Sequence, residues 1–114
     1  MPSQGDIVLI PIPFTDLSSQ KRRPVIVISN DQYNQTAPDV VVVAMTSTPM
    51  SSPYSFVIDA ADLVQGALNR PGTIRVDKVY TLEKSLIVKT FGRVNDRTLD
   101  RIRAALTELT KSNP

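Results

Sequence analysis

The chain has 114 residues, a mass of 12.5 kDa and a formal net charge of +2, which fits one globular domain spanning residues 1–114. It contains neither cysteine nor histidine. Their absence excludes a disulfide framework, a thiolate or imidazole metal site, a Ser-His-Asp triad and a cysteine nucleophile. The small positive charge gives only weak support for an anionic partner.

Valine, isoleucine and threonine account for 32 of the 114 residues, and this β-branched content favours strands over helices. Apolar runs such as residues 40–45 are far too short to span a bilayer. Residues 1–6 lack the basic start and apolar stretch of a signal peptide. We therefore expect a cytoplasmic protein that contacts no membrane.

The first half of the chain predicts four strands, over residues 7–10, 24–28, 40–45 and 54–58. A polar loop joins the first two strands, and Pro24 starts the second, where a residue without an N–H is tolerated. Ser29-Asn30-Asp31 closes the second strand and is expected to cap a short helical turn through Gln35. The third strand holds four consecutive valines, which predicts burial on both of its faces.

The second half predicts a short helix or irregular segment over residues 60–68, a turn at 69–72, and strands at 73–76 and 85–94. A terminal helix follows, capped by Asn95, with Leu99, Ile102, Leu106 and Leu109 at helical spacing. Many short strands and one terminal helix predict a mainly β fold with added α structure, built as a strongly curved sheet or partly open barrel.

Two groups of polar residues are candidates for binding a phosphate. Arg23 ends the basic run of residues 21–23, and Pro24 holds its backbone extended. Thr46, Ser47 and Thr48 follow the valine strand, so Thr46 lies near Arg23 if the second and third strands are neighbours. A guanidinium and a hydroxyl would then share one concavity. The simpler explanations are a solvated charge run and a turn.

A third candidate group is the Arg75-Val76-Asp77 segment. Residues two apart in an extended strand point to the same face, so Arg75 and Asp77 are expected side by side. Such a pair is commonly only an ion pair. Near Arg23, it would add a second cation and a carboxylate base to the phosphate site.

Several short motifs occur in order along nearly the whole chain. The first half carries Gly5-Asp6-Ile7-Val8, Pro13-Phe14-Thr15-Asp16-Leu17, Arg23-Pro24-Val25-Ile26-Val27-Ile28-Ser29 and Ala44-Met45-Thr46-Ser47. The second half carries Val76-Asp77-Lys78, Thr81-Leu82 and, before the terminal helix, Gly92-Arg93-Val94. From about residue 4 to 110, this arrangement resembles the MazF/PemK family of bacterial toxins.

The resemblance implies a small SH3-like, partly open barrel of the CcdB/PemK type with a C-terminal helix, acting as a homodimer. It also implies a toxin of a type II toxin-antitoxin system, blocked by a cognate antitoxin protein. The implied activity is a sequence-selective endoribonuclease on single-stranded RNA that needs no metal or other cofactor. In that chemistry the RNA's own 2′-OH attacks, leaving a 2′,3′-cyclic phosphate and a 5′-OH.

Carried over to this sequence, the family's Arg-Pro arginine is Arg23 and its Thr-Ser threonine is Thr46. An Arg-x-Asp pair proposed as acid and base in some members corresponds to Arg75 and Asp77. A normal aspartate pKa makes such a base weak unless burial raises it. We expect further RNA contacts from loops 14–22 and 47–54, made by Thr15, Lys21, Arg22, Ser47 and Thr48.

The chain departs from the family in the loop after the first strand. Some members carry His-Glu or Gly-His-Glu there, whereas this loop reads Phe14-Thr15-Asp16-Leu17-Ser18-Ser19-Gln20, so no role of those side chains transfers. Two alternatives stay open: a CcdB-like gyrase-binding toxin without chemistry, and an inactive relative that binds nucleic acid. RNA cleavage without added metal would discard both.

Overall fold

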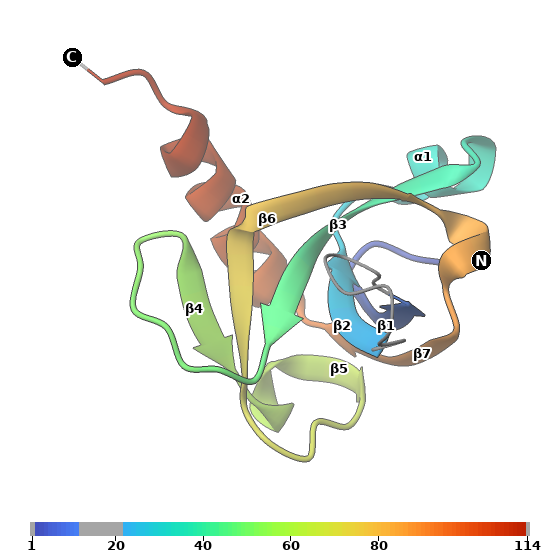
Figure 1. The fold of residues 1–114 in the computed structure, drawn as a ribbon, viewed down its shortest axis with the longest axis horizontal. Coiled ribbons are helices and arrows are strands. Elements are labelled where there is room, and N and C mark those ends of the chain that lie inside the picture. The colour runs from blue at the N-terminus through green and yellow to red at the C-terminus, as the bar shows by residue number, and fades with distance from the viewer. Residues whose placement is uncertain (1, 12–21, 114) are drawn as a thin grey trace.

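A computed structural model describes residues 2–11 and 22–113, and its strands form one antiparallel sheet in the order β4-β6-β3-β2-β1-β7-β5 (Figure 1). The strands are β1 (Asp6–Pro11), β2 (Arg22–Val27), β3 (Asp39–Thr46), β4 (Ser55–Ile58), β5 (Leu63–Gly66), β6 (Gly72–Glu83) and β7 (Lys89–Val94). Two α-helices, α1 (Asp31–Thr36) and α2 (Asp96–Thr110), and two short 3-10 turns, η1 (Ala60–Asp62) and η2 (Lys84–Leu86), complete the elements of this part of the chain. The predicted class, mainly β with a C-terminal helix, is confirmed.

The curved sheet has a hydrophobic cluster on each face, because alternate residues of its central strands point to opposite sides. One cluster packs the sheet against Leu99 and Ile102 of α2. The other lies on the opposite face and includes Val8, Ile10, Val25, Val27, Val40 and Val42. β3 contributes to both clusters, as its valine run predicts, with Val42 in the second and Val43 in the first.

β6 is three times longer than the predicted strand at residues 73–76. It pairs with β4 and β3 up to Arg75, and with β3 again from Val79 to Glu83. Between Val43 and Ala44 the register with β3 shifts, so residues 76–78 have no opposite residue in β3. The charged Asp77-Lys78 pair interrupts the apolar pattern at this bulge, and for that reason the strand's continuation was not predicted.

The segment at residues 60–68 was predicted only loosely, as a short helix or an irregular excursion. It forms the turn η1 and then the edge strand β5, which pairs with β7. Gly66 has a positive φ of 82°, and a Cβ there would lie 2.2 Å from the carbonyl oxygen of Phe91. Glycine is therefore required where the two backbones meet. This strand gave no alternating signal because three of its four residues are exposed.

Two predicted strand starts were wrong. Pro24 is the third residue of β2, not its first. The proline is accommodated because pairing with β3 begins only at Val25, so no N–H is needed toward that neighbour. The last strand begins at Lys89 instead of residue 85, because η2 occupies the segment before it.

The two helices start where the sequence predicts. The side chain of Asn30 accepts a hydrogen bond from the Tyr33 N–H, and that of Asn95 accepts one from the Thr98 N–H. The apolar stripe of α2 is buried at its first two positions, whereas Leu109 is exposed near the helix end. Within residues 2–11 and 22–113, no helix is long and apolar enough to cross a membrane.

Candidate anion-binding site

The neighbouring strands β2 and β3 bring the two firmest candidates together. Val25 pairs with Ala44, and the same register continued by two residues places Arg23 opposite Thr46. Both residues line one open cleft with a volume of about 340 Å³, together with Arg22, Pro24, Met45 and Ser47. The expectation that the second and third strands are neighbours is confirmed, and Arg23 and Thr46 share one concavity.

β6 places Arg75 on the same face of the sheet. In antiparallel pairs, opposite residues share a face, and here Thr46 is opposite Thr73 while Ala44 is opposite Arg75. Arg23 and Arg75 thus start two strand spacings apart across the sheet, about 10 Å, and two residues apart along the strands, about 7 Å. Ala44, which has a small side chain, lies in β3 between Val25 of β2 and Arg75 of β6. Arg75 is not among the residues that line the Arg23 cleft.

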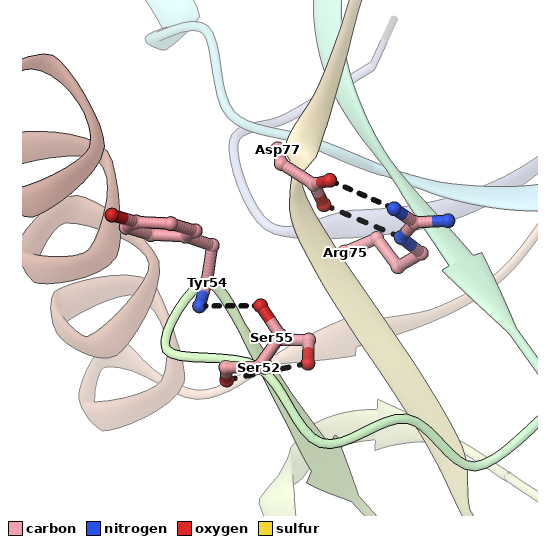
Figure 2. Close-up of polar contacts among 5 residues, drawn as sticks. All are labelled: Ser52, Tyr54, Ser55, Arg75 and Asp77. Carbon is pink, nitrogen blue, oxygen red and sulfur yellow. Dashed lines mark hydrogen bonds and ion pairs between the residues drawn. The ribbon is translucent and has the colours of Figure 1, made fainter.

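Arg75 and Asp77 form the expected side-by-side ion pair (Figure 2). Arg75 Nη2 donates to Asp77 Oδ2 at 2.8 Å, and Nε donates to Oδ1 at 3.3 Å. The hydrogen bonds from Arg75 are the main cause that holds the pKa of Asp77 below its ordinary value. At neutral pH the carboxylate is therefore ionised and weakly basic. The burial that would raise its basicity does not dominate here.

The segment before β4 anchors this part of β6. The Tyr54 N–H donates to Ser52 Oγ at 3.0 Å, which shapes the turn shown in Figure 2. The Tyr54 carbonyl in turn accepts a 2.9 Å hydrogen bond from the N–H of Val76. The residue between Arg75 and Asp77 is thus fixed through its backbone although it has no partner in β3.

The structure divides the residues expected to contact RNA. Arg22 and Ser47 line the cleft, and Thr48 is exposed just beyond it. The Thr48 N–H donates to Thr46 Oγ1 at 3.2 Å, so the turn explanation for this segment also holds. The hydroxyl of Thr46 keeps its proton available for a phosphate oxygen. Thr15 and Lys21 lie outside the described residues.

A second pocket, not predicted from the sequence, adjoins the cleft. Leu68, Asn69 and Arg70 approach Phe91 of β7 beside the end of β3. The only sequence signal was the turn chemistry of residues 69–72. These segments come together through the pairing of β5 with β7, which was not predicted. In the described part of the chain, no group of three or more acidic side chains is placed to hold a metal ion.

The fold and the site define a class of protein: a small antiparallel half-barrel that presents arginines and a threonine hydroxyl on one open face. The sequence profile of the PemK-like, MazF-like toxins of type II toxin-antitoxin systems matches residues 3–110. The chain belongs to this family, and the resemblance seen in the sequence is confirmed.

Solved structures share the fold over nearly the whole chain. A mycobacterial endoribonuclease is 25% identical with a TM-score of 0.77, covering 99% of this chain and 95% of its own. Another, in complex with its cognate antitoxin, is 23% identical with a TM-score of 0.76 and 100% coverage of both chains. A MazE-MazF structure from Deinococcus radiodurans is 21% identical with a TM-score of 0.78, covering 98% and 97%. The search among curated proteins gave no match.

Proposed function

We propose that this chain is a sequence-selective endoribonuclease that cuts single-stranded RNA without a metal ion. The observation that carries the proposal is the cleft that Arg23 and Thr46 line together from two paired strands. A guanidinium keeps its charge at any working pH and binds phosphate through two parallel N–H donors. Membership of the MazF-like toxins and the likeness to mycobacterial endoribonucleases support RNA as the phosphate-bearing substrate.

The proposed reaction uses the RNA's own 2′-hydroxyl as nucleophile. Its oxygen bonds to the adjacent phosphorus and loses its proton, while the bond from phosphorus to the 5′-oxygen breaks and that oxygen gains a proton. The products are a 2′,3′-cyclic phosphate and a 5′-hydroxyl. No water enters this step, so the reaction does not require a metal-bound hydroxide.

Arg23 and Thr46 would act where negative charge develops. Arg23 stabilises the extra charge on the pentacoordinate phosphorus, and the Thr46 hydroxyl donates to a non-bridging oxygen. Arg75 supplies a second cation from the neighbouring strand. Arg22, Ser47 and Thr48 contact the flanking RNA, as do Thr15 and Lys21.

For Asp77 we favour a positioning role over that of general base. A base working near neutral pH needs a pKa shifted toward that pH, whereas the pKa of Asp77 is lowered by Arg75. Its two hydrogen bonds instead hold the guanidinium of Arg75 at a fixed angle on the sheet. Asp77 would therefore contribute to catalysis only by positioning Arg75.

The proposed partners are a cognate antitoxin and a second copy of the chain. The family description and the antitoxin complex of the mycobacterial structure support the first. The homodimer is proposed from the family resemblance. An RNA substrate places the action in the cytoplasm, and residues 1–114 would form one toxin domain.

The test is incubation of the pure, antitoxin-free protein with mixed-sequence RNA in excess EDTA, followed by mapping of the new ends. We expect discrete cuts with 5′-hydroxyl ends that disappear in Arg23→Ala. Arg97→Ala is the matched control, because Arg97 is an exposed arginine on α2, away from the cleft. A folded Arg23→Ala protein that cuts at the wild-type rate would contradict the assignment.

Intact RNA would separate the remaining alternatives. Binding of RNA without cleavage would indicate an inactive relative that serves as a nucleic-acid-binding protein. Neither binding nor cleavage by a folded protein would point to a gyrase-type toxin that acts by binding a protein.

A further inference from the structure

The second pocket lies directly against the proposed phosphate cleft. It has a volume of about 290 Å³, and the two hollows share four lining residues at the ends of β2 and β3: Pro24, Met45, Thr46 and Ser47. Thr46 faces the side that carries Arg23, whereas Met45 belongs to the hydrophobic cluster on the α2 side. A chain that crosses these strand ends would therefore pass from a cationic surface into an apolar one.

The pocket walls are apolar and held in place by the core. Leu68 and Phe91 are half-buried and pack against the cluster that contains Met45. Gly72 brings the backbone against Met45, since a Cβ at Gly72 would lie 3.0 Å from the Met45 sulfur. Pro24 and Pro71 add two further apolar surfaces. A flat aromatic ligand suits such a site, because stacking needs rigid apolar and aromatic walls.

The rim of the pocket carries polar groups that the fold does not use. Asn69 and Arg70 are exposed, and within the described residues neither makes a hydrogen bond or an ion pair. The Asn69 amide offers two N–H donors and one carbonyl acceptor, a combination that pairs with the edge of a base. Arg70 adds a positive charge where a further phosphate of the same strand would pass.

We propose that this pocket binds one unpaired nucleobase of the RNA, next to the phosphate held by Arg23 and Thr46. The base stacks against the Phe91 and Leu68 wall, and the Asn69 amide reads its edge. The inference rests on the proposed endoribonuclease function and adds to it a determinant of the cleavage motif. It assigns base selection to residues 68–72 and 91, in addition to the RNA contacts expected from residues 14–22 and 47–54.

The first experiment maps the cut sites of Asn69→Ala and Phe91→Leu on a randomised RNA pool in EDTA. We expect base preference to weaken by about tenfold at one position beside the cut and to stay unchanged at the others. Asn113→Ala is the matched control, because Asn113 is exposed in the C-terminal tail and lies far along the chain from every lining residue. Thermal unfolding of each variant checks that the sheet is intact, above all for the half-buried Phe91.

The second experiment measures binding, so that failure of this inference is distinct from failure of the proposed function. The probe is the preferred RNA with a 2′-deoxy nucleotide at the cut site, compared with the same RNA carrying an abasic nucleotide at the position that the mapping identifies. If no RNA is cut, the probe is one short single-stranded RNA of mixed sequence, and the abasic nucleotide is placed at each position in turn. We expect one abasic substitution to weaken wild-type binding about tenfold and to weaken Phe91→Leu binding much less.

Unchanged base preference in both folded pocket variants would overturn the inference while leaving the nuclease assignment intact. If the wild-type protein cuts no RNA, the proposed function fails, and the binding experiment alone decides whether the pocket binds a base. An abasic effect in the wild-type protein that is reduced in Phe91→Leu would still support a base pocket, and equal binding of all probes would refute it.

Discussion

Replacing Asp77 by asparagine removes the negative charge that Arg75 contacts but keeps an oxygen that can accept a hydrogen bond from one N–H group of Arg75. Five N–H bonds point outward from a guanidinium, and Asp77 occupies one on Nε and one on Nη2. Three N–H bonds of Arg75 then remain for a phosphate. The side chains are 26% and 32% exposed, so RNA can reach the pair without unfolding the sheet.

The geometry sets the size of the expected effects. Loss of a donor group aimed at a charged transition state typically costs about 10²–10³ in kcat, so Arg75→Ala is expected to lose about 100-fold. Asp77→Asn keeps the guanidinium of Arg75 but loosens its orientation, and we expect kcat to fall about tenfold. Because Asp77 acts through Arg75, adding Asp77→Asn to Arg75→Ala should cost nothing further.

The assay is kcat/KM for one short RNA in EDTA, measured for the wild type, both single variants and the double variant. Thermal unfolding serves as the control, because a partly exposed ion pair contributes at most about 1 kcal/mol to stability. Losses that multiply in the double variant would refute the positioning role. So would a loss of about 10³ or more in Asp77→Asn alone, which would identify Asp77 as the proton acceptor.

Three further predictions concern the fold that supports the site. The pKa of Asp77 is lowered in the folded state, so the ion pair stabilises the fold at pH values above the unfolded pKa of about 3.9. This stabilisation is lost as the pH falls through the lower folded pKa. In urea unfolding at pH 7 and pH 3, Asp77→Asn should therefore lose less stability on acidification than the wild type. Gly66→Ala should lower the free energy of unfolding by more than about 2 kcal/mol, and Gly5→Ala should lower it by less. A Cβ at Gly66 would lie 2.2 Å from the Phe91 carbonyl oxygen, whereas the nearest atoms to a Cβ at Gly5 are 3.4 Å away. Equal unfolding free energies of the two variants would contradict this. Asn95→Ala should lower the free energy of unfolding by about 1 kcal/mol, because it removes the N-cap of α2. An unchanged urea midpoint would show that the cap is dispensable.

The meeting of Arg23 and Thr46 was predictable because their strands are adjacent in sequence. Only α1 and short turns separate β2 from β3, and consecutive strands usually pair. Once they pair, the apolar residues that must face each core fix the register. The place of Arg75 was not predictable in this way. It depends on β6 pairing with β3 across the intervening β4 and β5, and no local pattern encodes that.

The bulge in β6 explains why the sequence pattern fails at the same place where the site is built. Without it, the register that pairs Ala44 with Arg75 would continue and set Asp77 opposite Val42. Val42 is fully buried, so a carboxylate there would enter an apolar cluster at a cost of several kcal/mol. The shift instead places Tyr80 opposite Val42, and its ring packs on that cluster. Asp77 is thereby displaced to the exposed side, where Arg75 is its partner. The same displacement that breaks the alternation of a regular strand therefore keeps the core apolar and leaves a fixed guanidinium beside the cleft.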